Sequence, residues 1–407
     1  MKYTFTLLYI GLMLCLCMHT IAQANIVFNA DFNDCDAFDN VSAVMGDIVG
    51  NPTCECAVNG SGFRFDGIND SIGYEEGVED LLNNDFAISF YFFLDIAAGN
   101  NQEVDLVSYG DNECFRDSSL TVRYIPQTNS IRTEVSINDA IIFNMIGGVP
   151  GNTCWNYIVI NKNQDRLEMY INDELVADNL DFDRDFQFKP NGILSIGGSP
   201  CISSFTSRFR GLIDEFRIYD RPLVESEVLS ENQRPDQIIT EDQTIFVGES
   251  LNIQTGNNCT GSFSWMPTDN LADFFTKDPI ASPTETSTYT YTVNYGTCFS
   301  RDSIRISIVE PGESQCDKLL LPNAFTPNND RRNDEYGISN DFIVDNLKSF
   351  EIFSKWGEKV FDAIDINDKW DGNYKGQQMK PGTLLYRIVY DCNEEEFCAT
   401  GSFVLIR

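Results

Sequence analysis

Acidic side chains are the chemically active residues that this chain of 407 residues holds in abundance, and histidine is the one it almost lacks. The sequence has 62 Asp and Glu residues against 28 Lys and Arg, a formal net charge of −34, and its single histidine is His19. We interpret the segment around His19 as a removable signal peptide, so we expect no histidine in the mature protein. Histidine-based acid–base catalysis, Ser-His-Asp and Cys-His pairs, and histidine-ligated zinc or iron are then excluded. Carboxylates without histidine suit the binding of hard cations and of neutral polar molecules.

The charge balance also decides against two classes of partner. Nucleic acid binding needs a basic surface for the phosphates, so we expect no nucleic acid partner. An anionic membrane surface is disfavoured for the same reason. Hydrophobic residues make up 42% of the chain and charged residues 22%, which predicts folded domains with real cores.

Residues 1–24 are predicted to be a secretory signal peptide. They hold Lys2 as the one charged residue, an apolar stretch over residues 7–18, and the small-x-small sequence Ala22-Gln-Ala24. The apolar stretch is shorter than the roughly 20 residues that span a bilayer. No other segment is long and apolar enough, so we expect no transmembrane segment after removal of the signal.

The cysteines are the second group of residues with chemistry. Of thirteen, Cys15 and Cys17 lie in the signal, and the eleven that remain in an exported chain are expected to form disulfides. Cys54 and Cys56 form a C-x-C sequence, and without nearby histidines we interpret them as disulfide partners rather than zinc ligands. Because eleven is odd, at least one thiol stays unpaired or bonds another chain.

The elements that must position these residues are almost all strands. Hydrophobic and polar residues alternate with period two, and Gly, Asn, Asp and Pro separate the runs. Asn172-Asp173 predicts a tight hairpin turn, because both residue types tolerate positive φ. Only Leu223–Asn232, after Pro222, predicts a helix. The clearest strand predictions are Phe86–Leu94, Trp155–Ile160, Leu167–Ile171 and Ile193–Ile196.

The predicted fold class is all-β, a jelly-roll sandwich followed by two smaller immunoglobulin-like β-sandwiches. The predicted division is a signal peptide (1–24), a jelly roll (25–222), a short helix and linker (223–236), a spacer domain (237–310) and a C-terminal domain (316–407).

Three segments of the first block resemble laminin-G-like, concanavalin-type jelly rolls. They are Phe63-Arg-Phe-Asp-Gly-Ile-Asn-Asp-Ser-Ile72, the run Cys154-Trp-Asn-Tyr-Ile-Val-Ile160 with Leu167-Glu-Met-Tyr-Ile-Asn-Asp-Glu-Leu175, and Phe209-Arg-Gly-Leu-Ile-Asp-Glu-Phe-Arg-Ile-Tyr-Asp-Arg-Pro-Leu223. The resemblance implies a glycan- or protein-binding scaffold. It also implies a calcium ion that ties the beginning of the block to its last strand, for which Asp31 and Asp214 are the candidate ligands, with capping or solvated acids as the alternative.

Related jelly rolls include glycosidases with the strand sequence Glu-x-Asp-x-Glu. Here Glu103-Val-Asp105 lacks the third acid, and no positioned carboxylate pair can be located from the sequence. We therefore expect a protein that is not an enzyme.

The second block resembles an immunoglobulin-like or polycystic-kidney-disease-type sandwich. Cys259 precedes Trp265, and Cys298 follows a Tyr-rich strand, so the resemblance implies a Cys259–Cys298 bridge between its sheets. No site chemistry is visible, and we expect a rigid spacer.

The last block resembles the gliding-motility-associated C-terminal domain of Bacteroidota. The matching segments are Leu321–Asp334, Phe350–Phe361, Trp370–Gly376, Pro381–Tyr386 and Phe403–Arg407. The resemblance implies export through the type IX secretion translocon, with this domain as the sorting signal. Cys392 and Cys398 flank an expected hairpin tip and are predicted to pair, which leaves Cys316 as the odd cysteine. The motif residues are Asp330, Asn333, Asp334, Trp356, Gly357, Trp370, Asp371, Gly372 and Arg407.

These features predict a secreted or surface-attached binding or adhesion protein, whose jelly roll binds a glycan or a surface protein. Two alternatives remain open at this point. One is a secreted polysaccharide-active enzyme whose carboxylates are not yet placed, and the other is a structural component of the surface or gliding apparatus.

Overall fold

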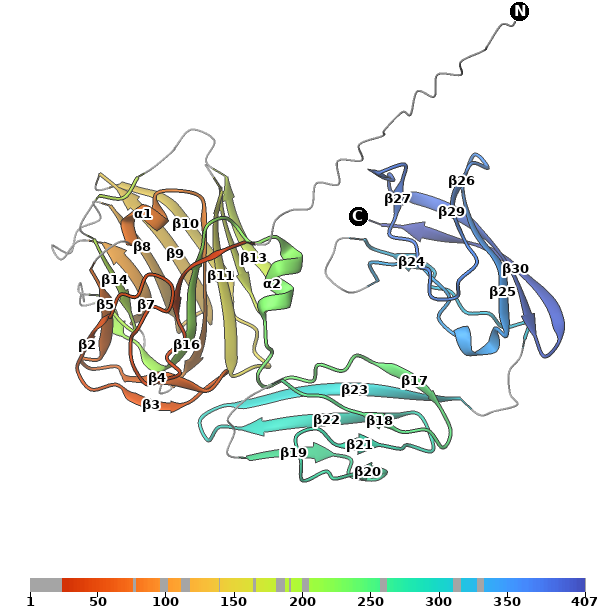
Figure 1. The fold of residues 1–407 in the computed structure, drawn as a ribbon, viewed down its shortest axis with the longest axis horizontal. Helices are drawn as coiled ribbons and strands as arrows, with labels where there is room; N and C mark the ends of the chain where they lie inside the picture. The colour runs from red at the N-terminus through yellow and green to blue at the C-terminus, as the bar shows by residue number, and fades with distance from the viewer. Residues whose placement is uncertain are drawn as a thin grey trace, which may run out of the picture.

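The protein is all-β, as the alternating sequence predicts, and its strands gather into three successive sandwich-like parts (Figure 1). The computed structural model describes residues 24–75, 78–95, 102–110, 118–138, 140–163, 166–180, 187–189, 192–199, 205–256, 262–309, 316–327 and 333–406. Residues 1–23 of the predicted signal peptide therefore lie outside the described residues.

The jelly roll is built from two large sheets packed face to face. The first sheet has the order β13 (Glu174–Leu180), β12 (Arg166–Ile171), β11 (Trp155–Asn163), β6 (Phe86–Leu94), β16 (Arg210–Tyr219), β4 (Ser61–Asp66) and β3 (Thr53–Cys56), with β1 (Ile26–Ala30) also paired to β16. The second sheet has the order β10 (Ala140–Gly148), β9 (Ser130–Ile137), β8 (Ser119–Ile125), β7 (Glu103–Gly110), β14 (Ile193–Ile196), β5 (Ser71–Tyr74) and β2 (Asp47–Val49), with β15 (Thr206–Arg208) parallel to β7. A short helix, α1 (Val78–Leu82), precedes β6.

The core between the sheets is aromatic. Phe90 of β6 stacks on Phe216 of β16 with ring centroids 5.9 Å apart, and Phe28 of β1 meets Tyr74 of β5 edge-on at 4.9 Å. The turn Asn172-Asp173 has positive φ at both residues, 49° and 76°, which confirms the predicted tight hairpin between β12 and β13.

The outer face of the first sheet is also buried, which explains why β6 reads as a continuous apolar run. Tyr91 and Phe93 of β6 and Trp155 and Tyr157 of β11 form a second apolar cluster on this face. Helix α2 (Glu225–Glu231), predicted from Leu223–Asn232, packs Val228 against the cluster.

The second sandwich pairs a four-stranded sheet with a three-stranded one. The first has the order β17 (Gln243–Phe246), β23 (Phe299–Val309), β22 (Ser287–Asn294) and β19 (Ser262–Met266); the second has β18 (Leu251–Asn252), β21 (Ile280–Ala281) and β20 (Leu271–Ala272). Its own core contains Trp265, Tyr289 and Tyr291.

The third sandwich is built on a five-stranded sheet. Its order is β24 (Ala324–Phe325), β30 (Glu395–Leu405), β29 (Gly382–Cys392), β25 (Asn346–Ser354) and β26 (Lys359–Ala363), with the small hairpin β27 (Asn373–Tyr374) and β28 (Gln377–Gln378) and the 3₁₀ helix Asp341–Ile343 beside it. Tyr336 stacks on Phe403 with ring centroids 3.5 Å apart, at the centre of its core.

The predicted Cys259–Cys298 bridge is wrong, because Cys298 bonds Cys154 of the jelly roll. Cys298 lies between β22 and β23, and the end of this hairpin docks on the outer face of the first sheet, where Tyr295 meets Phe93 at 5.1 Å. The Cα atoms of the bonded cysteines are 5.9 Å apart. Cys259 lies outside the described residues.

Polar contacts extend this junction between the jelly roll and the second sandwich. The Asp236 carboxylate accepts hydrogen bonds from the backbone N–H groups of Cys154 and Trp155, at 2.7 and 3.3 Å. The Ser300 hydroxyl donates to the carbonyls of Asn152 and Asp236, at 3.1 and 3.0 Å. The second sandwich is therefore fixed to the jelly roll by a covalent bond and a buried polar network, rather than strung on a linker alone.

The predicted Cys392–Cys398 bridge is also wrong. Cys392 bonds Cys316, and Cys398 is a free, exposed thiol. In the β29–β30 hairpin, Cys392 lies opposite Glu395 and is buried, whereas Cys398 lies opposite Val389. Because Glu395 and Cys398 are an odd number of residues apart, the cysteines point to opposite faces of the sheet. A second disulfide, Cys35–Cys54, and a disulfide at Cys56 agree with the interpretation of the C-x-C sequence.

The sorting-motif residues take distinct structural roles. Trp370 is buried and donates its indole N–H to the carbonyl of Asn373 at 2.8 Å, while the Asp371 carboxylate accepts from the N–H of Asn373 at 2.9 Å. Trp356 is 85% exposed. Asn333, Gly357 and Gly372 all have positive φ, Asp334 lies next to Asn333, and Asp330 and Arg407 lie outside the described residues.

Candidate functional site

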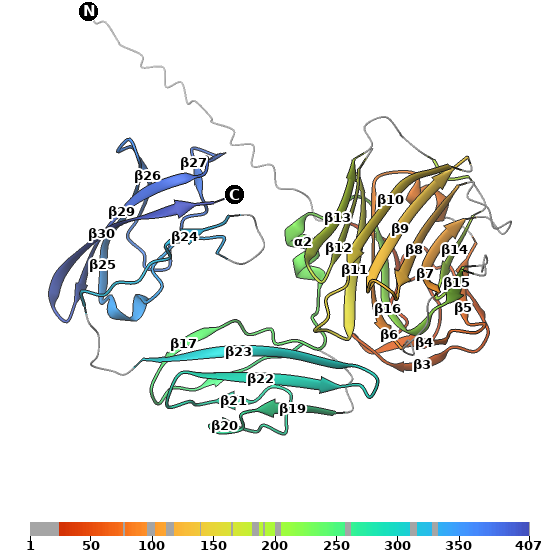
Figure 2. The same ribbon diagram turned by 180° about the vertical axis from the view of Figure 1, so that it is seen from behind.

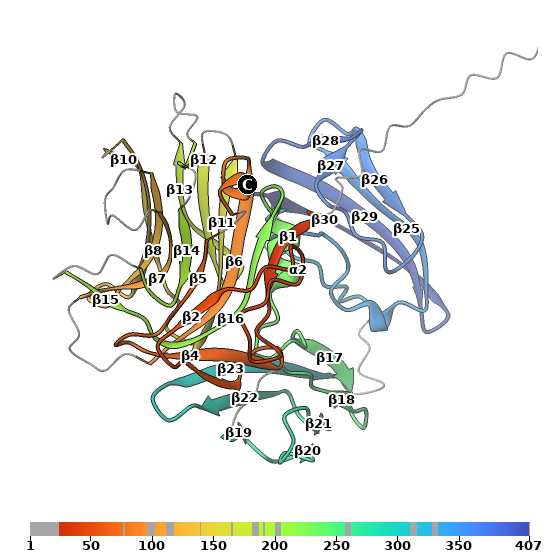
Figure 3. The ribbon, with the colours of Figure 1, turned by 60° about the vertical axis from the view of Figure 1, so that its left-hand side comes forward.

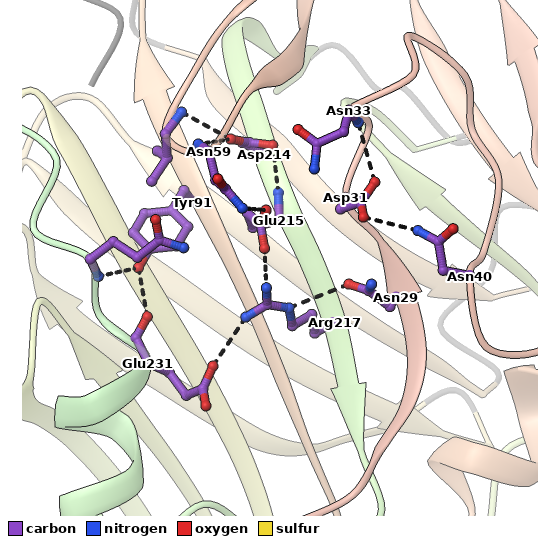
Figure 4. Close-up of polar contacts among 12 residues, drawn as sticks. Asn29, Asp31, Asn33, Asn40, Asn59, Tyr91, Asp214, Glu215, Arg217 and Glu231 are labelled. Atoms are coloured by element: carbon purple, nitrogen blue, oxygen red, sulfur yellow. Dashed lines mark hydrogen bonds and ion pairs between the residues drawn. The ribbon is translucent and has the colours of Figure 1, made fainter. Parts of the chain in front are cut away.

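Asp31 and Asp214 lie in one corner of the jelly roll, where its first strand joins its last (Figure 4). β1 pairs antiparallel with β16, with Ala30 opposite Phe216, so Asp31 follows β1 directly beside the Asp214-Glu215 pair. The Asp31 carboxylate accepts hydrogen bonds from the backbone N–H of Asn33 at 3.2 Å and from the side chain of Asn40 at 3.0 Å.

Asp214 is completely buried and is held by backbone donors. Its Oδ2 accepts from the N–H groups of Val58 and Asn59 at 2.9 and 3.1 Å, and its Oδ1 accepts from the N–H of Glu215 at 2.8 Å. Burial nevertheless raises the pKa of Asp214 to about 8, and the neighbouring Glu215 charge adds to the shift. The corner is therefore short of positive charge.

Arg217 supplies part of that charge. Its guanidinium pairs with Glu215, bonds Glu231 of helix α2 at 3.1 Å, and donates to the Asn29 side chain at 3.3 Å (Figure 4). One guanidinium thus faces several acids, which raise the pKa of Arg217 against the opposing effect of burial.

A hard cation fits this corner as a two-carboxylate site completed by neutral oxygens. Among the described residues, no group of three or more Asp, Glu, His or Cys side chains is gathered closely enough to hold a metal without such help. Calcium accepts amide and carbonyl oxygens beside carboxylates. Asp31 and Asp214 are the carboxylates that would hold it, and the ion would keep Asp214 ionised at neutral pH.

The outer face of the second sheet carries a different polar arrangement, which we call the polar face. On β7, β8 and β9 the side chains of Leu120, Val122, Ile131 and Val135 point into the core, so the alternate positions point outward. The register places Asp105 opposite Arg123, and Arg123 opposite Arg132. The residues of the polar face are Glu103, Asp105, Arg123, Arg132 and Glu134, with Arg208 of β15 in register beside Asp105.

Carboxylates and guanidiniums alternate across the polar face. The Arg123 Nε donates to Asp105 at 2.6 Å, and its Nη1 donates to Glu134 at 3.1 Å. Arg132 forms an ion pair with Glu103. Apart from Asp105, these side chains remain partly open to solvent, with exposed fractions between 16% and 27%.

Two atoms of the polar face are buried without a hydrogen-bond partner among the described residues, the Asp105 Oδ2 and the Arg132 Nε. One is an acceptor and the other a donor, and buried polar atoms are normally satisfied. Burial raises the pKa of Asp105, and the Arg123 charge opposes this shift. Unsatisfied groups of both kinds on one face are what a polar ligand or bound water would complete.

An exposed aromatic ring flanks the polar face. The backbone carbonyl of Phe205 accepts a hydrogen bond from the N–H of Glu103 at 3.0 Å, and the Phe205 side chain is 78% exposed. Figure 2 shows β15 beside β7 in the second sheet. An exposed ring next to paired charges is a composition that binds the apolar and the hydroxylated surfaces of one molecule.

Sequence reasoning singled out Glu103 and Asp105 as an incomplete catalytic set and did not identify Arg123, Arg132, Glu134 or Phe205. The structure brings Glu103 and Asp105 onto one face of β7, as their i, i+2 spacing requires. The alternations Thr121-x-Arg123 and Arg132-x-Glu134 on the neighbouring strands were the available signal. Their partners depend on register across three strands, which spacing along one strand does not reveal.

Comparison with protein families confirms both resemblances found in the sequence. Residues 66–229 match the concanavalin A-like lectin/glucanases superfamily, and residues 319–405 match the CHU_C type IX secretion signal domain. The chain therefore carries a concanavalin-like jelly roll and a type IX secretion signal, and it is exported to be secreted or attached to the cell surface. No helix within the described ranges has the length and apolar character to cross a membrane.

Many solved structures are similar to the chain at low identity. Domain 4 of the arabinanase AbnA from Geobacillus stearothermophilus, in complex with arabinotriose, is 18% identical, with 51% of this chain and 98% of that chain covered and a TM-score of 0.39. The receptor-binding domain of a botulinum neurotoxin C/D mosaic serotype is 13% identical (67% and 72%, TM-score 0.44). The CBM40 domain of Ruminococcus gnavus IT-sialidase, bound to α2,3-sialyllactose, is 15% identical (42% and 95%, TM-score 0.34). No curated protein shows significant similarity to the chain.

Proposed function

We propose that this protein is a secreted or surface-attached glycan-binding protein whose jelly roll binds sugars on the polar face. The observation that carries the proposal is the set of ion-paired carboxylates and guanidiniums beside the exposed ring of Phe205. Sugars offer hydroxyl groups that both donate and accept hydrogen bonds, and paired Glu and Arg side chains match them with acceptors and donors. The apolar face of a sugar ring packs on an exposed aromatic side chain.

The placement of the polar face supports this proposal. The outer face of the first sheet is occupied by helix α2 and by the docked hairpin of the second sandwich. Figure 3 shows β7, β8 and β10 on the side of the jelly roll farther from the other two sandwiches. The second sheet is therefore the broad surface of the jelly roll on which a polymeric ligand meets no obstruction from the docked domains.

The test is binding of glycans by the full mature chain, first on a glycan array and then by titration calorimetry. Phe205→Ala is expected to weaken binding at least tenfold. Phe275 of the second sandwich is 82% exposed, so Phe275→Ala is the matched control and should leave the affinity unchanged. Absence of binding to any glycan, or equal losses in both variants, would contradict the proposal.

Glycoside hydrolysis is a second candidate, because Glu103 and Asp105 share one face of a strand. Hydrolysis needs one protonated and one ionised carboxyl group on opposite sides of the scissile bond. Here each carboxylate is engaged by its own guanidinium, which suits fixed hydrogen bonding better than proton transfer. Release of reducing sugar from polysaccharides by the purified protein, lost in Glu103→Gln, would establish the enzyme instead.

We also propose a structural calcium ion in the corner of Asp31 and Asp214. The proposal is supported by the excess of acids in that corner and by the raised pKa of Asp214. Such an ion would join the first strand to the last and would lie apart from the polar face.

A further inference from the structure

The polar face is electrically balanced in a chain that is strongly acidic. Its three carboxylates, on Glu103, Asp105 and Glu134, face the guanidiniums of Arg123 and Arg132, and Arg208 adds a third positive charge that lowers the pKa of Asp105. The whole chain carries a formal net charge of −34. An anionic ligand thus meets long-range repulsion from the protein and no net attraction at this face.

Short-range contacts lead to the same conclusion. A sugar carboxylate or sulfate would have to replace Asp105, Glu103 or Glu134 as the partner of a guanidinium, and would leave that acid partly buried without its counter-charge. A neutral hydroxyl group does not require this exchange. It can donate to a carboxylate oxygen and accept from a guanidinium while the ion pair stays intact.

The atoms without partners define the hydroxyl pattern. The Asp105 Oδ2 is a buried acceptor and the Arg132 Nε a buried donor, and both belong to the neighbouring strands β7, β8 and β9 through the Asp105–Arg123–Arg132 register. Adjacent acceptor and donor groups suit two neighbouring hydroxyls on one sugar ring, of which one donates and the other accepts. Phe205 then receives the apolar side of a ring at the edge of the face.

We infer that the ligand class of the polar face is a neutral glycan with adjacent free hydroxyl groups, and that acidic sugars are rejected. This inference rests on the proposed glycan-binding function and names its ligand. The Glu103–Arg132 and Arg123–Glu134 ion pairs act as specificity-determining elements, because they occupy the guanidiniums that an acidic sugar would need.

The test compares neutral and acidic sugars of matched structure on the full mature chain. Titration calorimetry would use lactose against α2,3-sialyllactose, and β-1,4-galacto-oligosaccharide against oligogalacturonate of equal length. We expect at least tenfold tighter binding of the neutral member of the pair that binds, with little dependence on salt. Equal or tighter binding of the acidic member would overturn the inference and leave the proposed function standing, whereas no binding of any glycan overturns both.

Charge-removing variants make the test independent of overall affinity. Glu103→Gln keeps a hydrogen-bond acceptor and frees Arg132 from its ion pair, so the ratio of acidic to neutral affinity should rise at least tenfold. Glu134→Gln frees one arm of Arg123 and should act in the same direction, which guards against a folding defect in either variant. Thermal melting would establish that the variants are folded. An unchanged ratio in both folded variants would overturn the role given to the ion pairs.

Discussion

Removing the Cys154–Cys298 bridge should separate the jelly roll from the second sandwich without unfolding either. The bond joins residues 144 positions apart. In the chain-entropy description, closing a loop of that length stabilises the folded state by about 5 kcal/mol. The second sandwich keeps its own core around Trp265, so the loss falls on the docking of the two parts rather than on either sheet.

The double variant Cys154→Ser/Cys298→Ser has a matched control in Cys35→Ser/Cys54→Ser. The control bond lies wholly within the jelly roll and joins residues 19 apart, which corresponds to about 3 kcal/mol in the same description. We expect the control to lower the melting temperature of the jelly roll alone. Loss of the longer bridge should instead split a shared transition into two, with the second sandwich melting first.

Differential scanning calorimetry of the full mature chain is the assay, with limited proteolysis near Asp236 as a second readout. Cleavage there should be faster only in the variant without the interdomain bridge. A single transition at an unchanged temperature, together with unchanged proteolysis, would refute the docking described here. Such a result would mean that the Asp236 and Ser300 contacts alone hold the two parts together.

Three further predictions follow from the same structure. Burial raises the pKa of Asp236 from 3.8 to about 6, so the folded state binds this proton more tightly and the stabilisation is lost as the pH rises; Asp236→Asn should remove about 3 kcal/mol of the fall in stability between about pH 4 and pH 6, measured by urea unfolding. Calcium at 100 times its dissociation constant should raise the stability by about 2.7 kcal/mol, and an identical melting point in EDTA and in calcium would remove the ion. Trp370→Ala should destabilise the third sandwich by about 3–5 kcal/mol because the indole is buried, whereas Trp356→Ala, at an exposed position, should leave its melting temperature unchanged.

Local patterns predicted the strands well because each depends on neighbouring residues only. Phe86–Leu94 was predicted and observed with the same bounds, and the Asn172-Asp173 turn follows from residues that tolerate positive φ. Helix α2 lies within the predicted Leu223–Asn232. The fold class and the secretion signal were accessible for the same reason, because they are carried by contiguous motifs.

The disulfides were not predictable from such patterns because they depend on contacts between distant parts of the chain. Cys259 and Cys298 were paired on the assumption that the second sandwich is self-contained, but Cys298 lies at a hairpin end that docks on another domain. Cys392 and Cys398 are close in sequence, yet the register of β29 and β30 places them on opposite faces. The polar face escaped prediction likewise, since Arg132 and Glu103 meet only after the strands of the second sheet have aligned.

The docked hairpin and the polar face bear on each other through the two-sheet construction of the jelly roll. A sandwich offers two broad outer surfaces, and here the apolar one, with Tyr91, Phe93 and Trp155, is consumed by the rest of the chain. The remaining surface is the charged one, and its ion pairs lie on strands that make no contact with the docked hairpin in the register described above. The domain described from sequence as a spacer therefore determines which face of the jelly roll can receive a ligand. Because it is fixed by a covalent bond, it also holds that face in a constant direction relative to the second sandwich, so that a ligand on the polar face is presented away from it.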